Sequence, residues 1–306
     1  MSIRSALTCS QEGSGIEGPL SSGDYPALFR AADTHAQDQQ RLFFIVLGFE
    51  LLLIVTATGI SVVGSPLAWV AVLQATVLFA ALGCAVFLFS TKPDRHWYTA
   101  RAVAESVKTI TWRYVMRAEP FDVDDAAARE QFRETLKEIV DQNQDVAGRF
   151  RTDLAGVQRT EAMEQLRRAD FLVRKGAYTT GRIVEQQEWY ARKSSMNSCR
   201  ATRAFIFLVA SLGLAGVFAI ARVQFPEAPR WPTDLFVSLA IAGVAWIQAK
   251  RFTELAAAYS LAAVEISNIR LQADDVTHDG ALSSFVGDAE NAFSREHTQW
   301  AARKDI

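Results

Sequence analysis

The sequence predicts an all-α membrane protein with two transmembrane helical hairpins, four spans in total, and long cytoplasmic amphipathic helices. Two observations lead to this prediction. Very apolar runs alternate with strongly polar segments, so that 50% hydrophobic and 22% charged residues average to a mean hydropathy of only +0.06. No segment alternates convincingly with period two, so essentially no sheet is expected. The net charge of −2 also argues against a nucleic-acid binder held by overall charge.

The first hairpin is predicted from the apolar runs 42–64 and 67–90. Each run can cross a hydrocarbon core of about 30 Å, because an α-helix rises about 1.5 Å per residue. The turn Gly64-Ser65-Pro66 between them is so short that the two spans must be antiparallel.

The second hairpin is predicted from the runs 204–221 and 234–249, joined by a proline-rich loop. The fourth run is short for a span. Trp231 can lie at one membrane interface, and Lys250 and Arg251 can reach the other. Lys and Arg gather after the second span, before the third and after the fourth, whereas the first hairpin loop has none. Because such residues favour the cytoplasmic side, both termini and residues 91–203 are expected to face the cytoplasm from an inner membrane.

The polar segments carry helical patterns. Pro93 should interrupt the helix after the second span, and a new helix from about Asp94 should end before Pro120. Further helices are expected over residues 122–150, near 158–175, from Tyr178 into the third span, from the fourth span to about 273, and over 283–303. Their apolar faces are Trp97, Ala100, Ala104, Val107, Thr111 and Tyr114, then Phe132, Leu136, Ile139, Val146 and Phe150, and last Phe285, Ala289, Phe293, His297 and Trp300.

These amphipathic faces have two interpretations. Helices from both halves of the chain can pack together beneath the membrane, or some faces can remain open for a partner or a second copy. The domain organisation follows from the same pattern. We expect a disordered, Gly- and Ser-rich tail over 1–24, a first two-transmembrane unit over 25–121, a helical connector over 122–170 and a second two-transmembrane unit over 171–306.

Glu50 is the one acidic residue inside the first apolar run. It lies about eight residues, or roughly 12 Å, from the cytoplasmic edge. A carboxylate at the centre of a span costs a few kcal/mol, about 2.5–3.5 on insertion scales. Three interpretations stay open: a protonated Glu50 hydrogen-bonded inside a helix bundle, a carboxylate facing a water-filled path in an oligomer, or a side chain that reaches the interface or lies closer to it because the span begins deeper in the sequence than assumed.

Other polar and small residues in the spans suggest separate roles for the two hairpins. Thr56, Thr58, Ser61 and Gln74 make the first hairpin the better candidate for lining a pore. Small residues permit close helix packing, and they recur as Gly83 in the first hairpin and as Ser211, Ala215, Ala219, Ser238 and Ala242 in the second.

Motifs for catalysis are missing from the sequence. The histidines His35, His96, His278 and His297 have no metal-ligand spacing, and there is no phosphate-binding loop or nucleophile elbow. His297 lies beside Glu296, where packing or hydrogen bonding explains it best. We therefore expect neither an enzyme nor a cofactor or metal.

Four segments resemble bacterial SLATT domains, the SMODS and SLOG-associating two-transmembrane effectors. They are "YPALFRAAD" (25–33), "WYTARAVAESVKTITWRYVMRAEPF" (97–121), "GRIVEQQEWYARKS" (181–194) and "FSREHTQWAAR" (293–303). The resemblance covers most of the chain beyond about residue 25 and looks like two such domains in tandem. Its family-like residues are Trp112, Arg113, Tyr114, Arg117, Trp189, Tyr190, Glu296, His297 and Trp300.

The resemblance implies a membrane effector of a bacterial conflict system, including anti-phage defence, that oligomerises or opens a pore when a separate sensor or nucleotide-signalling protein triggers it. A ring of copies repeating Glu50 would favour cations. The alternative is a membrane-anchored scaffold that recruits a cytoplasmic partner without a pore. A secondary transporter is a third class, but it would need mid-span helix breaks that this sequence lacks.

Overall fold

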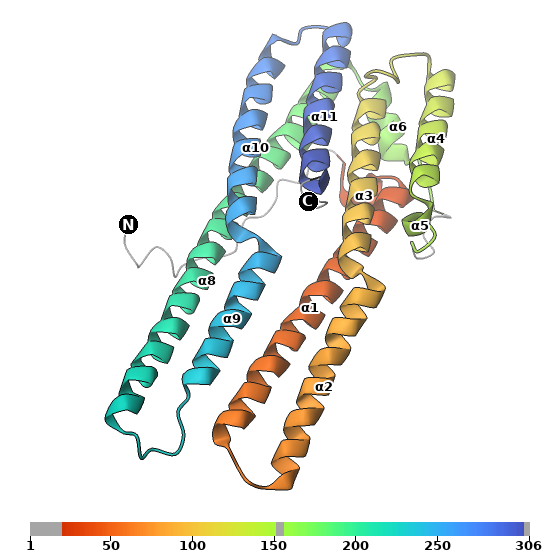
Figure 1. Cartoon of the computed structure of the whole chain (residues 1–306). Helices are drawn as coiled ribbons and strands as arrows, with labels where there is room; N and C mark the ends of the chain where they lie inside the picture. Colours follow the sequence, from red (N-terminus) through yellow and green to blue (C-terminus); the bar gives the residue numbers. More distant parts are fainter. Residues whose placement is uncertain (1–19, 151–155, 303–306) are drawn as a thin grey trace. The chain divides into compact units, whose positions relative to one another are not determined.

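The computed structural model describes residues 20–150 and 156–302, with side chains up to residue 294. Over these ranges the chain is helical and contains no strand, as predicted (Figure 1). Three short segments have other helical geometries: 3₁₀-helices at Ser22–Asp24 and Ala273–Asp275, and a π-helix at Thr179–Val184. The α-helices are α1 Ala27–Val63, α2 Ala68–Thr91, α3 Pro93–Val115, α4 Asp125–Gln142, α5 Gln144–Ala147, α6 Glu161–Arg168, α7 Phe171–Tyr178, α8 Glu185–Gln224, α9 Thr233–Lys250, α10 Phe252–Gln272 and α11 Asp279–Ala302.

The chain divides into two compact units. The hairpin unit consists, within the described residues, of Arg41–Pro93 and Lys193–Ala258. The bundle unit consists of the described parts of Glu12–Gln40, Asp94–Arg192 and Tyr259–Ile306. The helices α1 and α8 each contribute to both units, so the first and third membrane spans are continuous with polar helices.

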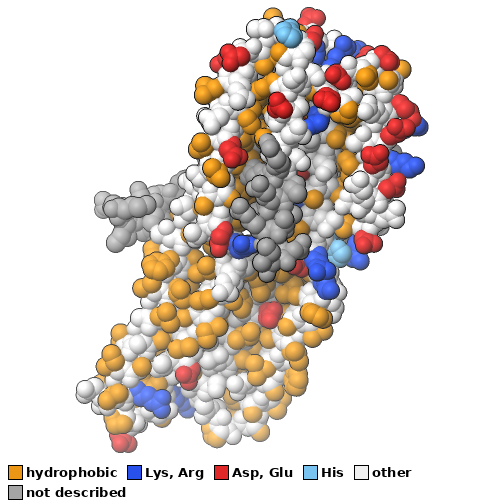
Figure 2. Space-filling view, turned by 45° about the horizontal axis from the view of Figure 1, so that its top comes forward, with side chains coloured by type: hydrophobic (Ala, Val, Ile, Leu, Met, Phe, Trp, Pro, Cys, Tyr) orange, Lys and Arg blue, Asp and Glu red, His pale blue; other side chains and the backbone are white. Residues whose placement is uncertain are grey.

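The hairpin unit contains the ends of α1 and α8 together with α2 and α9, arranged as two antiparallel pairs (Figure 1). In each pair, both helices are long enough and apolar enough to cross a membrane. Large apolar side chains point outward, and hydrophobic side chains cover the face of this unit seen in Figure 2. Within the apolar spans themselves, the buried residues are small, namely Ala57, Ala81, Ser211, Ala215 and Ala240. This distribution suits lipid as the solvent, because small residues let membrane helices approach closely.

Both hairpins end in the same way. Lys92 after α2 and Arg251 after α9 have left-handed backbones, with φ of 45° and 48°. Each donates its backbone N–H to the carbonyl four residues earlier, Leu88 at 3.0 Å and Ile247 at 2.8 Å. These bonds close the helix ends as left-handed caps. The break at Pro93 is as predicted, but the helix expected to run from the fourth span to about 273 is interrupted at Arg251.

The helix expected near 158–175 is also interrupted. Ala169 is extended between α6 and α7. The Arg117 guanidinium donates to the carbonyl of Arg167 at 2.9 Å, and that of Arg174 donates to the carbonyl of Ala169 at 3.0 Å. These side chains satisfy carbonyls that the helix end leaves without backbone partners. The segment expected to be helical over 122–150 forms α4 and α5, and Asp124 caps α4 by accepting from the N–H groups of Ala126 and Ala127.

The bundle unit holds one apolar core, built from both halves of the chain. The predicted face of α3 is buried at Ala100, Ala104, Val107, Thr111 and Tyr114. From the other half, α10 contributes Ala262 and Ile266, and α11 contributes Leu282, Val286, Ala289 and Phe293. This confirms packing between helices of the two halves. Most of the predicted N-terminal tail lies outside the described residues, but Leu20 is buried in this core.

Candidate functional site in the membrane hairpins

Glu50 lies on α1 within the hairpin unit, and its side chain is half-buried. Its neighbours Phe49 and Leu52 are more than half exposed. Among the residues that the structure describes, none forms a hydrogen bond or an ion pair with the Glu50 carboxyl group. A carboxyl group inside a membrane span requires a polar partner, because hydrocarbon cannot solvate it. The described residues leave the Glu50 carboxyl group without such a partner.

The other polar residues of the first hairpin bond locally. The hydroxyl of Thr56 donates to the carbonyl of Leu52 at 2.8 Å, and that of Thr58 donates to Ile54 at 3.1 Å. Ser61 is exposed near the end of α1. The amide Nε2 of Gln74 on α2 donates to the carbonyl of Ala57 at 3.2 Å and so links the two spans. Of the five predicted intramembrane residues, Thr56, Thr58 and Gln74 bond to helix backbone, whereas Glu50 and Ser61 have no hydrogen bond within the described residues.

The second hairpin uses small residues for packing. Ser211 and Ala215 are buried, and the Ser211 hydroxyl donates to the carbonyl of Phe207 at 2.9 Å. Near the turn, the rings of Phe218 and Phe236 stack with centroids 5.4 Å apart. The other residues predicted for packing are less enclosed: Ser238 and Ala242 are half-buried, whereas Ala219 and Gly83 are exposed.

The two hairpins contact each other through an aromatic cluster. The ring of Trp246 on α9 lies edge-on to Phe44 on α1, with centroids 5.9 Å apart. The ammonium of Lys250 lies 3.1 Å from the centroid of Phe44, in cation–π geometry. Gly48, one turn from Phe44, gives Trp246 the room to approach. Both hairpins therefore belong to one membrane unit.

The family-like residues of α3 lie in the bundle unit and have structural partners. The indole N–H of Trp112 donates to the Tyr25 hydroxyl at 3.0 Å. The Arg113 guanidinium donates to the carbonyl of Gly287 and the side chain of Asn291 on α11. Trp189 and Tyr190 pack against the ring of Tyr259. The side chains of Glu296, His297 and Trp300 lie outside the described residues.

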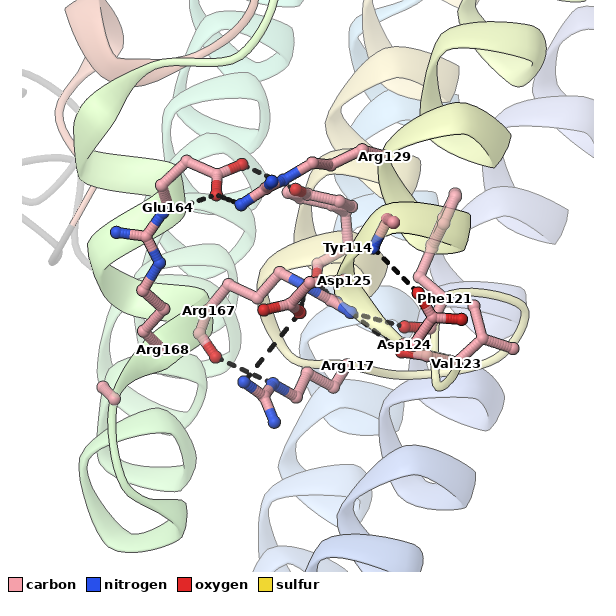
Figure 3. A network of polar contacts seen from close by, with 12 residues as sticks. Tyr114, Arg117, Phe121, Val123, Asp124, Asp125, Arg129, Glu164, Arg167 and Arg168 are labelled. Atoms are coloured by element: carbon pink, nitrogen blue, oxygen red, sulfur yellow. Dashed lines mark hydrogen bonds and ion pairs between the residues drawn. The ribbon is translucent and has the colours of Figure 1, made fainter.

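Arg167 joins the end of α3 to the start of α4 (Figure 3). Its buried guanidinium donates to the carbonyl of Tyr114 at 2.6 Å, to that of Phe121 at 3.1 Å and to the Asp125 carboxylate at 3.0 Å. It also lies over the Tyr114 ring, 4.8 Å from the centroid. Arg167 therefore satisfies carbonyls at a helix end and in the following loop.

Glu164, one turn before Arg167 on α6, forms ion pairs with several arginines (Figure 3). Its carboxylate accepts from the Tyr114 hydroxyl at 2.6 Å and pairs with Arg129, Arg159 and Arg168 at 3.0, 2.7 and 3.3 Å. Desolvation opposes ionisation, but the hydrogen bonds from Tyr114 and Arg129 and the charge of Arg159 hold the pKa of Glu164 below its usual range. The same burial and the bond to Glu164 raise the pKa of Tyr114 to about 12.

Glu290 of α11 is the most enclosed carboxylate described, with no exposed side-chain surface. The Arg182 guanidinium donates to both of its oxygens, at 2.8 and 2.7 Å. The hydroxyls of Tyr178 and Thr109 each donate to it at 3.0 Å. Arg182 lies in the π-helix and Thr109 on α3, so this network joins the two halves of the chain. Glu164, Arg167, Arg182 and Glu290 were not predicted from the sequence. A charged residue next to an apolar helix face has the same sequence pattern whether it is buried in an ion pair or exposed to solvent.

Family models match nearly the whole chain in two consecutive parts. Residues 26–175 match SMODS and SLOG-associating 2TM effector domain 3, and residues 178–300 match SMODS and SLOG-associating 2TM effector domain 1. The first match includes the segment predicted as a connector. No curated protein and no solved structure matches the chain. With one apolar hairpin in each matched part, the chain belongs to the SLATT family as a multi-pass membrane protein with two SLATT effector domains in tandem.

Proposed function

We propose that this protein is a bacterial inner-membrane effector of an anti-phage or other conflict system, which oligomerises and permeabilises or depolarises the membrane when a separate sensor or nucleotide-signalling protein triggers it. The family supports the effector role, since both matched domains are described as effector domains. The observation that carries the pore is Glu50, a carboxyl group in a span without a partner in the described chain.

The geometry favours a path between copies over a path within one subunit. Small buried residues such as Ala57, Ala81 and Ala215 let the spans pack closely, which leaves little room for water inside one hairpin. A closed ring of copies would place one Glu50 per subunit around a central opening. Repeated carboxylates at a constriction favour cations over anions.

The proposal is tested in a bacterial host that produces the full chain together with its trigger, using a potential-sensitive dye. We expect rapid depolarisation with the wild type and a strongly reduced response with Glu50→Gln. The matched control is Glu227→Gln, which removes an exposed acid between the spans of the second hairpin and should depolarise like the wild type. Intact potential and growth under a verified trigger would exclude the effector role.

A scaffold without a pore is favoured by one observation. The bundle unit exposes apolar side chains on α7, where Leu172 is 74% exposed and Val173 57%, and on α10 at Leu261 and Leu271. Adjacent exposed apolar side chains such as Leu172 and Val173 can contribute to a partner site. A scaffold predicts that Leu172→Asp abolishes the response to the trigger, whereas Glu50→Gln leaves it unchanged as long as the protein is present in the membrane.

A further inference from the structure

A cleft of about 440 Å³ opens between α1, α8 and α9, entirely within the hairpin unit. Its residues from α8 follow a helical stripe, Arg200, Arg203, Ala204 and Phe207. Those from α9 follow the same spacing from Leu239 to Trp246. Residues three, four and seven positions apart share one helix face, so the two stripes form facing walls.

Two glycines let aromatic rings pack closely against the helices around the cleft. Gly48 on α1 and Gly243 on α9 line the cleft. A Cβ atom at Gly243 would lie 3.2 Å from the Phe207 ring, and one at Gly48 would lie 3.5 Å from Trp246. A larger residue at either position would fill the cleft or push its walls apart.

The lining changes from basic to apolar along the cleft. Arg200 and Arg203 are exposed and precede the apolar part of α8. Phe207 and Leu239 line the part that lies further into the hairpin. Arg200 and Phe207 are about 10 Å apart along the helix axis, given a rise of about 1.5 Å per residue. Trp246, near the end of α9, suits an interfacial position.

This combination identifies the ligand chemistry. Arginines recognise phosphate through planar, bidentate hydrogen bonds. The apolar walls require an occupant with a hydrocarbon chain, which excludes a free inorganic anion. The two arginines favour a net negative charge, which a neutral lipid does not carry. Basic pockets between membrane helices suit anionic lipid head groups.

We propose that this cleft binds one anionic phospholipid, with its phosphate at Arg200 and Arg203 and an acyl chain along Phe207 and Leu239. Glu50 does not line this cleft. The proposal requires only that the hairpins span a membrane. It therefore goes beyond the proposed pore and can be tested without any trigger.

The test measures binding of dioctanoyl phosphatidylglycerol to the full-length protein in nonionic detergent by calorimetry. We expect one saturable site. Each basic residue near an anionic head group strengthens binding about 5.5-fold, so the double variant Arg200→Gln/Arg203→Gln should bind roughly 30-fold more weakly. The matched control is Arg222→Gln/Arg230→Gln, which removes the same charge at exposed positions outside the cleft and should bind like the wild type.

A second variant tests the apolar half of the site. Gly243→Leu should abolish binding while circular dichroism and gel filtration show a folded protein, and Ala242→Val replaces it if that variant aggregates. The proposal is overturned if phosphatidylcholine with the same chains binds equally well, or if the control double variant weakens binding as much as the cleft variant. Equal binding of glycerol 1-phosphate would show a site for free anions and exclude a lipid occupant.

Discussion

Buried or half-buried glutamates have different partners in the two units of this protein. In the bundle unit, Glu290 and Glu164 are enclosed by arginine and tyrosine donors. In the hairpin unit, Glu50 has no such donor within the described chain. Breaking a buried ion pair is costly because it leaves one charge without compensation. We therefore expect Glu290 and Glu164 to stabilise the fold, and Glu50 to contribute little to it.

The largest expected effect comes from breaking the Arg182–Glu290 pair. Glu290→Gln leaves the buried Arg182 guanidinium without its counter-charge, and we expect a loss of about 3–5 kcal/mol in the free energy of unfolding. Chemical denaturation of the detergent-solubilised protein, followed by circular dichroism, measures it. A double variant, Arg182→Met/Glu290→Met, should recover much of this loss, because it removes both charges. A loss below about 1 kcal/mol for Glu290→Gln would show that the pair does not stabilise the bundle.

A smaller effect is expected at Tyr114. Tyr114→Phe removes the hydroxyl that donates to Glu164 but keeps the ring beneath Arg167. Since a hydrogen bond to a charged group contributes about 1.5–3 kcal/mol, we expect a loss at the lower end, because three arginines still pair with Glu164. A double-mutant cycle with Glu164→Gln separates the Tyr114–Glu164 bond from other effects of removing the hydroxyl. An equal loss for Tyr114→Phe in the wild type and in Glu164→Gln would contradict a specific role for this bond.

Acid should weaken the bundle unit through the same carboxylate. The pKa of Glu164 is lower in the folded protein than in the unfolded chain, so the unfolded state binds more protons in acid. The stabilisation is complete above the unfolded pKa of about 4.3 and is lost as the pH falls through the folded value. Unfolding midpoints measured between pH 7 and pH 3 should fall less steeply for Glu164→Gln than for the wild type. Parallel curves would show that Glu164 is not stabilised as an anion.

The smallest effect on stability is expected at Glu50. Glu50→Gln removes a charge without breaking any bond in the described chain, so the free energy of unfolding should change by less than about 0.5 kcal/mol. The same denaturation assay measures it beside Glu290→Gln. A loss as large as that of Glu290→Gln would mean that Glu50 has a structural partner, and the contrast between the two units would fail.

The membrane spans could be predicted because the bilayer imposes a simple rule on composition and length. The break at Pro93 was also predictable, since proline removes an amide. The matching break at Arg251 was not, because no glycine or proline marks it and an arginine adopts the left-handed backbone there. The separation of α6 from α7 depends on guanidinium groups of Arg117 and Arg174, which lie far from each other in sequence.

The candidate site could be predicted only in part. Glu50 stands out because its neighbours in sequence are apolar. Arg182 and Glu290 do not, because each lies among other polar residues and their pairing joins positions 108 residues apart. The cleft at Gly243 likewise depends on which faces of α1, α8 and α9 meet, and helical periodicity does not fix that.

The most direct test of the central claim is the ion selectivity of the purified protein in planar bilayers. Reversal potentials are measured in a salt gradient for the wild type, Glu50→Gln and the control Glu227→Gln. We predict cation-selective currents for the wild type and the control, and a reversal potential closer to zero for Glu50→Gln, because the ring of carboxylates is lost. Identical reversal potentials in all three proteins would contradict the account.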